Sequence, residues 1–392
     1  MLGGISVSNN IAYFDNAATT FPKPEEVYLF MDKFYRECGV NVGRGQHKLA
    51  SRASALVLET RNMLLELLHC PNKNLILTHT ATEALNMILR GIPISDGYNI
   101  YISPFEHNAV TRVITHLSKH HRLNIQTLAF DKIANAYDLR KIKDQFSDVK
   151  PNIVIISHAS NVFGILAPIQ QICDLSKAYR AINVIDMCQT AGLVDTDLSS
   201  ENIDFAVFAG HKTLYGPLGV AGFIYSGQIE LTPLIYGGTG TDSQNQSMPD
   251  TIPERYEAGS SNIHAISGLH AALNWIKKTG IKRIYEIEQQ NRCKLIEILS
   301  NYDNIRVLPP INADAAIGVV SCVFEQYAAD DIGRILDERG VAVRTGLHCA
   351  PYAHEFFGTF PAGTVRFSVG YFNTEEDFDR LNDALRVIQE NM

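Results

Sequence analysis

Two charged residues follow apolar runs of the kind that form buried strands. Lys212 comes shortly after the run Phe205–Ala209, and Asp186 directly follows Ile182–Ile185. Charged side chains are seldom left at the ends of buried strands unless they are paired or take part in chemistry. The structural alternatives are a lysine that merely ends a strand and an aspartate that caps a helix.

Taken together, the two residues match the requirements of pyridoxal phosphate (PLP). The aldehyde of this cofactor forms a Schiff base with a lysine, and its ring nitrogen needs a carboxylate partner. The carboxylate keeps the pyridinium protonated, so the ring can accept electrons from a carbanion. We therefore predict that Lys212 binds PLP and that Asp186 pairs with its ring nitrogen.

A phosphate site is expected upstream of this pair. Residues 78–83, Thr-His-Thr-Ala-Thr-Glu, join a predicted strand to a predicted helix. Small residues there let backbone N–H groups at a helix N-terminus approach an anion, and Thr82 adds a hydroxyl. A capping box is the structural alternative for this Thr-x-x-Glu spacing. The position before a helix favours a phosphate site that includes Ala81 and Thr82.

Three further polar residues follow predicted strands. His107 comes after the segment Asn99–Ser103, where it could stack on an aromatic cofactor and relay protons. Asn161 and Gln189 could each reach the phenolic oxygen of a ring cofactor. The alternatives are a hydrogen-bonded loop histidine and an asparagine that caps a turn.

Residues 344–351, Arg-Thr-Gly-Leu-His-Cys-Ala-Pro, place Cys349 in a loop. A histidine or arginine near a cysteine favours the thiolate, which is the nucleophilic form. Arg366, on a predicted strand, is suited to hold a substrate carboxylate with two hydrogen bonds, and a surface salt bridge is its alternative. The other cysteines are interpreted as inert small hydrophobes: Cys38, Cys70, Cys173, Cys188, Cys293 and Cys322.

The composition is that of an ordinary soluble enzyme. The chain has 392 residues, 46% of them hydrophobic, and a net charge of -8, which gives no sign of a nucleic-acid footprint. No apolar run approaches the roughly 18 residues that span a bilayer, and residues 1–10 do not resemble a signal peptide. Seven cysteines without CxxC spacing argue against disulfides and a metal site. We expect a cytoplasmic protein that binds neither nucleic acid nor membrane nor metal.

Alternating strands and helices predict an α/β fold. Apolar segments at Leu75–Leu77, Ile153–Ser157 and Val184–Ile185 each precede a helical pattern, which indicates a mostly parallel sheet covered on both faces. The polar stretch Gly237–Asn262 is expected to be a long functional loop near a domain boundary. Helical patterns lie at Lys48–Leu68, Thr82–Leu89, Ile169–Tyr179, Ile263–Lys278 and Ile284–Leu299. The predicted units are a large domain of residues 15–262 and a small α+β domain of residues 263–392, on which residues 1–14 pack.

At this point the chain resembles the class V aminotransferase family, of PLP fold-type I, and within it the cysteine desulfurases and selenocysteine lyases. The resemblance runs nearly end to end through ordered motifs. The Arg-Thr-Gly-x-His-Cys loop resembles the compact-loop branch of the desulfurases. The motifs are Tyr13–Thr20, Ala81–Glu83, Glu106-His107, Ser160-Asn161, Asp186 with Gln189, Gly210–Lys212 with Tyr215–Pro217, Glu257–Ser260, the Cys349 loop and Arg366.

The resemblance implies a large domain with a seven-stranded, mostly parallel sheet flanked by helices, and a smaller C-terminal domain. It also implies roles for individual residues. Lys212 would hold PLP and move the α-proton, Asp186 would pair with the pyridinium, and His107 would stack on the ring. Asn161 and Gln189 would tune the phenolic oxygen, while Thr82, His211 and a second subunit's Ser260 would bind the phosphate. Arg366 would hold the cysteine carboxylate, with Asn16, Ala17 and Arg344 as further candidates, and Cys349 would attack the substrate sulfur to release alanine and leave a persulfide.

One departure concerns Ala209, where the family usually has a hydroxyl residue that contacts the phosphate. A hydrogen bond to a charged group is worth about 1.5–3 kcal/mol, so weaker PLP binding is expected. The leading hypothesis is a homodimeric, PLP-dependent cysteine desulfurase that passes sulfur from L-cysteine to an acceptor protein. Three alternatives stay open. The first is a selenocysteine lyase acting on L-selenocysteine, and the second is an aminotransferase, epimerase or β-lyase in which Cys349 is structural. The third is a degenerate PLP-binding partner protein.

Overall fold

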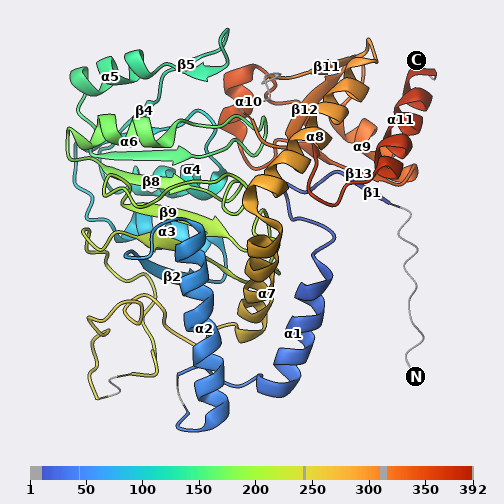
Figure 1. Cartoon of the computed structure of the whole chain (residues 1–392). Helices are drawn as coiled ribbons and strands as arrows, with labels where there is room; N and C mark the ends of the chain where they lie inside the picture. Colours follow the sequence, from blue (N-terminus) through green and yellow to red (C-terminus); the bar gives the residue numbers. More distant parts are fainter. Residues whose placement is uncertain (1–10, 44, 242–243, 310–315, 391–392) are drawn as a thin grey trace.

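The computed structural model describes residues 11–43, 45–241, 244–309 and 316–390. They form two main sheets of unequal size, each with helices packed around it (Figure 1). The expectation for residues 1–14 falls largely on residues 1–10, which lie outside the described residues.

The larger sheet has seven strands in the order β2-β10-β9-β8-β7-β3-β4. Neighbouring strands are parallel except at β10, which is antiparallel to both β2 and β9. The predicted seven-stranded, mostly parallel sheet is therefore confirmed. The strands are β2 (Asn74–Thr78), β3 (Asn99–Ile102), β4 (Asn124–Thr127), β7 (Ile153–Ser157), β8 (Ile182–Asp186), β9 (Phe205–Ala209) and β10 (Ala221–Tyr225).

This sheet has two covered faces because its central strands are apolar on both sides. In β9, Phe205 and Val207 join the core formed with α3 (Ala81–Gly91) and α4 (Asn108–Leu117). The alternate residues Ala206 and Phe208 join the opposite core. The helices that contribute most of this second core are α1 (Glu25–Cys38), α2 (Lys48–Leu67), α5 (Leu139–Asp148), α6 (Ile169–Lys177) and α7 (Ile263–Thr279). Helices α8 (Ile281–Ser300) and α10 (Pro351–Phe357) each add one buried residue, Ile284 and Ala353.

The structure corrects one predicted helix. The segment after β8 forms successive turns instead, in which the Met187 carbonyl accepts hydrogen bonds from the N–H groups of Thr190 and Ala191. Gly192 then takes a φ of 82°, a left-handed conformation that does not continue an α-helix. Because no helix intervenes, the chain returns by loops and turns alone to the neighbouring strand β9.

The smaller sheet is antiparallel, with strand order β11-β12-β15-β14. The short β1 (Ala12–Tyr13) pairs with β13 (Val341–Ala342), and Phe14 packs against Phe367 and Phe378 of the small core. Residues 12–14 thus lie against this unit. Its strands are β11 (Ile305–Val307), β12 (Val319–Phe324), β14 (Arg344–Gly346) and β15 (Thr364–Ser368). The helices that follow α7 in the chain are α8 (Ile281–Ser300), α9 (Ala329–Glu338), α10 (Pro351–Phe357) and α11 (Glu375–Glu390). Elsewhere in the chain, β5 (Phe130–Asp131) and β6 (Ala136–Tyr137) form a separate hairpin.

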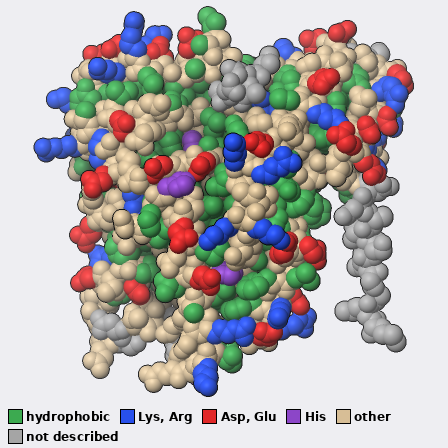
Figure 2. All heavy atoms as spheres, in the orientation of Figure 1, with side chains coloured by type: hydrophobic (Ala, Val, Ile, Leu, Met, Phe, Trp, Pro, Cys, Tyr) green, Lys and Arg blue, Asp and Glu red, His purple; other side chains and the backbone are tan. Residues whose placement is uncertain are grey.

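The predicted domain boundary after residue 262 stays a prediction. Helix α7 begins directly after it and packs on α1 and α2, while α8 contributes Ile284 to the large core and Leu295 to the small one. The described part of 237–262 contains no helix or strand, as expected for a loop. Within the described ranges, no helix is long and apolar enough to cross a membrane. Acidic and basic side chains are interspersed over the face shown in Figure 2.

Candidate active site

A cavity opens at the carboxyl ends of the parallel strands of the large sheet, where α/β folds commonly bind ligands. Asp186 ends β8, and Lys212 lies just beyond β9. Eight of the predicted cofactor-site residues line this one cavity: Ala81, Thr82, His107, Asn161, Asp186, Gln189, His211 and Lys212. The rest of the cavity wall is formed by Thr80, Leu85, Ala109, Ser157, Ala159, Cys188 and Ala209.

Asp186 is a buried carboxylate without a cationic partner among the described residues. Its side chain accepts a hydrogen bond from the N–H of Cys188 at 2.9 Å, and the residue is 8% exposed. Neither Asp186 nor Lys212 forms an ion pair with another described residue. Burying an unpaired carboxylate is costly, so the arrangement favours a ligand that brings its own positive charge.

His107 presents a neutral imidazole to the same cavity. Its Nδ1 accepts a hydrogen bond from the N–H of Ala109 at 3.0 Å, which caps α4 and leaves the ring proton on Nε2. Burial lowers the pKa of His107 to about 4, although the Asp186 carboxylate acts in the opposite direction. The Nε2–H group is therefore a neutral donor at physiological pH.

The end of the cavity at the start of α3 contains polar groups without partners among the described residues. Helix α3 begins at Ala81, and the first N–H groups of a helix have no acceptor within it. His211 has a buried Nδ1 with no hydrogen-bond partner among the described residues. Burial, with nearby Lys212 and Lys23, lowers the pKa of His211 to about 4, so its ring is neutral.

These groups fit PLP in their chemistry. Asp186 would face the ring nitrogen, Lys212 the aldehyde, and His211 with the start of α3 the phosphate. Ala209 lines the cavity without a side-chain donor, as the sequence indicated. Asn161 and Gln189 are partly engaged already, since their amide nitrogens donate to the His348 carbonyl at 2.8 Å and the Ala17 carbonyl at 2.9 Å.

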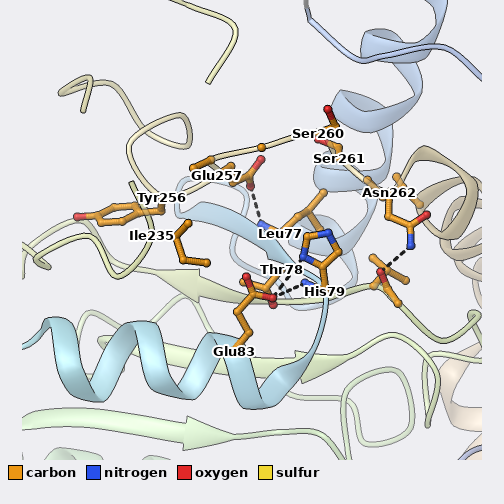
Figure 3. A pocket seen from close by; sticks show the side chains of 15 residues that line it. Leu77, Thr78, His79, Glu83, Ile235, Tyr256, Glu257, Ser260, Ser261 and Asn262 are labelled. Atoms are coloured by element: carbon orange, nitrogen blue, oxygen red, sulfur yellow. Dashed lines mark hydrogen bonds and ion pairs between the residues drawn. The ribbon is translucent and has the colours of Figure 1, made fainter. Parts of the chain in front are cut away.

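Ser260 does not line this cavity in its own chain. It is exposed and lies beside a neighbouring pocket together with His79 and Glu257 (Figure 3). Glu257 fixes this loop, because its carboxylate accepts the N–H of Leu77 at 2.6 Å and pairs with Arg61 at 2.5 Å. The predicted contact of Ser260 with a phosphate therefore requires a second subunit.

Cys349 lies in a groove that continues from the cavity, with Thr82, His107 and Ala109 common to both linings. The guanidinium of Arg344 donates to its Sγ at 3.2 Å, which gives a negatively charged sulfur a partner. Among the remaining cysteines, which were interpreted as inert small hydrophobes, Cys293 is exposed on the solvent side of α8. The other five are buried.

The loop that carries Cys349 is firmly held. The carbonyl of Cys349 accepts a hydrogen bond from the N–H of Asn108 at 2.7 Å, and the side-chain amide of Asn161 donates to the carbonyl of His348. His348 and Cys349 have φ values of 47° and 59°, a conformation that residues other than glycine seldom adopt. Surrounding contacts must maintain such a backbone, so the position of the thiol is well defined.

Arg366 is fully buried in β15, so its surface salt-bridge alternative is wrong. Its Nη2 pairs with Asp15 at 2.6 Å and its Nη1 donates to the Asn161 carbonyl at 3.0 Å. Its Nε is buried without a partner among the described residues. The guanidinium of Arg366 therefore lies against the backbone of Asn161, which lines the cavity, and its Nε–H is still without an acceptor among the described residues.

Asn16 and Ala17 support the site from outside the cavity. The side chain of Asn16 donates to the Ser368 carbonyl at 3.0 Å, and the N–H of Ala17 donates to the Ser368 hydroxyl at 2.9 Å. Since these donors are already satisfied, both residues anchor the chain beside Asp15. Their contact with substrate, and that of Arg344, stay predictions.

Comparison with known proteins agrees with this geometry. The model of the aminotransferase class-V family matches residues 12–381. The chain belongs to the class-V aminotransferase family. A probable cysteine desulfurase of Methanothermobacter thermautotrophicus is 30% identical over 385 residues, with 96% of this chain and 94% of the relative covered. A probable cysteine desulfurase of Xylella fastidiosa is 32% identical over 384 residues, with 96% and 90% covered.

Solved structures of this family share the fold. The apo cysteine desulfurase of Thermococcus onnurineus is 27% identical, with a TM-score of 0.88 over 98% of this chain and 96% of that one. The S-sulfonic acid form of the cysteine desulfurase CsdA from Escherichia coli is 24% identical, with a TM-score of 0.84 and 99% and 97% covered. This second likeness concerns the fold alone.

The buried guanidinium leads to a kinetic prediction. Replacing Arg366 by Ala removes the unsatisfied donor, and the loss of charge-assisted bonds should raise KM for an α-amino acid substrate roughly 10- to 100-fold. Arg366→Lys should not restore KM, because an ammonium lacks the fork of donors. Steady-state kinetics on PLP-loaded variants measure this. An unchanged KM in Arg366→Ala, with a raised KM in Arg344→Ala, would move the carboxylate site to Arg344.

Proposed function

We propose that this protein is a PLP-dependent cysteine desulfurase that converts L-cysteine to L-alanine and keeps the sulfur as a persulfide on Cys349. One observation carries the proposal. A cysteine in contact with a guanidinium lies in a groove that continues from a cavity containing an unpaired lysine and a buried carboxylate. The names of the relatives support it.

The roles of the side chains follow from their positions. When bound, PLP supplies an aldehyde for the substrate amino group and a ring that takes up electrons from the α-carbon. Lys212 would carry the proton to and from that carbon, and the neutral Nε2–H of His107 would stand beside the ring as a donor. Cys349, as a thiolate beside Arg344, attacks the sulfur, and Arg366 holds the carboxylate.

The position of Cys349 bears on the alternatives. A structural cysteine is expected to be buried and inert, whereas this one is partly exposed at the mouth of the site. That favours sulfur transfer over an aminotransferase, epimerase or β-lyase. Selenocysteine lyase uses the same constellation and stays the second candidate. The unpaired Lys212 and Asp186 argue against a degenerate binding protein.

We also propose a homodimer that shares its active sites, working in the cytoplasm. Large apolar side chains are exposed on α1 and α2, including Leu29 at 63% and Leu58 at 60%. Leu218, at 68%, adds to them from the loop between β9 and β10. Such apolar exposure suits a subunit interface. Ser260 lies outside its own cavity, so a partner subunit is the arrangement in which it could reach a phosphate.

The lysine assignment is tested by chemical trapping. Borohydride reduction of the PLP-loaded protein followed by peptide mapping should place the pyridoxyl group on Lys212, since this is the unpaired amine in the cavity. Labelling of Lys23 or of no lysine would contradict the assignment.

Replacing Cys349 by Ala should separate sulfur transfer from cofactor binding. The visible absorption of bound PLP should persist and respond to L-cysteine, while persulfide formation falls by roughly three orders of magnitude because the nucleophile is gone. Mass spectrometry of the cysteine-treated protein measures the persulfide. The matched control is Cys293→Ala, which removes the exposed cysteine of α8 and should leave persulfide formation unchanged. Undiminished persulfide in Cys349→Ala would locate the acceptor elsewhere.

The shared site is tested at Ser260. Ser260→Ala should weaken PLP retention during dialysis roughly tenfold, because Ala209 offers no compensating hydroxyl. The dimer should survive in light scattering, since its interface would be mainly apolar. Ser261→Ala is the neighbouring control and should retain PLP. An active, PLP-loaded monomer would refute the shared arrangement.

A further inference from the structure

Arg366 and Asp15 form an ion pair that is closed in this structure. The side chain of Arg366 is 1% exposed and that of Asp15 is 20% exposed, and the Nη2 of the arginine lies 2.6 Å from an oxygen of the aspartate. The Nη1 of Arg366 donates to the Asn161 carbonyl at 3.0 Å, so both terminal nitrogens of the guanidinium already have an acceptor. A substrate carboxylate therefore meets an arginine that already carries a carboxylate.

The carboxylate of Asp15 can turn, whereas its backbone is fixed. The N–H of Asn16 donates to the Ser368 carbonyl at 3.3 Å, and the N–H of Ser368 donates to the Phe14 carbonyl at 2.6 Å, so the end of β15 holds the chain on both sides of Asp15. Among the described residues, Arg366 provides the one hydrogen bond and ion pair of the Asp15 carboxylate. Rotation of this side chain breaks that single contact and turns a carboxylate that is already partly exposed toward water.

An exchange of carboxylates keeps the charge of Arg366 compensated throughout. Burial lowers the pKa of Arg366, and the Asp15 carboxylate acts in the opposite direction. Arg344 adds a second positive charge to the same surroundings. Removing one partner of a buried pair leaves an uncompensated charge, which is costly, whereas replacing one carboxylate by another avoids this cost.

We propose that Asp15 occupies the carboxylate site of Arg366 in the resting protein and that the carboxylate of the bound amino acid displaces it. The inference rests on the proposed function, because it needs Arg366 to hold the carboxylate of L-cysteine and L-alanine. Asp15 acts through Arg366 and does not touch the reacting atoms. As a competitor it weakens the binding of each amino acid carboxylate, which favours release of the alanine product.

This exchange and a purely structural role of Asp15 predict opposite results. A residue that only orients the guanidinium would, when neutralised, leave Arg366 misplaced and weaken carboxylate binding. A competing residue, when neutralised, leaves Arg366 uncompensated until the ligand arrives, so the ligand binds more tightly.

Equilibrium dialysis of the PLP-loaded protein against radiolabelled L-alanine or L-alaninamide measures the difference. In Asp15→Asn the Kd for L-alanine should fall about tenfold, which is the order of one charge-assisted contact, while the Kd for L-alaninamide should stay within about twofold of the wild-type value. The matched control is Asp383→Asn, which removes an exposed aspartate that pairs with Arg386 on α11. This control should leave both Kd values unchanged.

A measurement on the wild type keeps the test independent of how well the variant folds. Carbodiimide coupling of exposed carboxylates to ethanolamine, followed by peptide mapping, should label Asp15 several-fold more with saturating L-alanine than with saturating L-alaninamide, because the displaced carboxylate is unpaired and in water. Labelling of Asp383 in the same sample is the internal reference, since the carboxylate of L-alanine consumes reagent.

A Kd for L-alanine that is unchanged or higher in Asp15→Asn would overturn the exchange. Labelling of Asp15 that does not respond to L-alanine would overturn it as well. Equal binding of L-alanine and L-alaninamide by the wild type is a different failure, because it would contradict the carboxylate site at Arg366 that belongs to the proposed function.

Discussion

A carboxylate buried at the end of β8, without a cation from any described residue, is the constraint on which the rest of the site depends. The side chain of Asp186 accepts one hydrogen bond, from the N–H of Cys188, and forms no ion pair with a described residue, so a ligand with a positive nitrogen relieves a real electrostatic cost. The parallel sheet brings Lys212 to the same edge, and the start of α3 supplies unused N–H groups. The neighbouring histidines stay neutral because burial lowers their pKa values.

The second requirement is that two sheets meet at this edge. Cys349 follows β14 and Arg366 lies in β15 of the small sheet, yet both contact residues beside the large one, Asn108 of α4 and Asn161 after β7. Asn161 is the junction, since its side chain holds the Cys349 loop and its carbonyl accepts from Arg366. A shift of the small sheet would therefore displace the thiol and the guanidinium together. Sulfur chemistry at this site thus depends on the packing between the sheets as much as on the cavity.

The sequence predicted those features that follow from local patterns. Continuous apolar runs identified the buried strands β7 and β9, and the charged residues beyond such runs identified Asp186 and Lys212. Contacts between distant segments were not predictable in the same way. Asp15 belongs to the motif Tyr13–Thr20, but only the fold shows that it pairs with Arg366. The turns after β8 replaced a helix because a glycine took a left-handed conformation, and the groove beside Cys349 needed α3 and α4 to be placed side by side.

The central claim is that one site both breaks the carbon–sulfur bond of L-cysteine and retains the sulfur. The most direct test is to incubate the purified, PLP-loaded protein with L-cysteine and to measure alanine and sulfide with and without a reducing thiol. Our account predicts a burst of alanine stoichiometric with Cys349 and little sulfide when no reductant is present, and continuous, equal release of both when it is added. Sulfide that appears with pyruvate instead of alanine, or alanine formation that is indifferent to the reductant, would contradict the account.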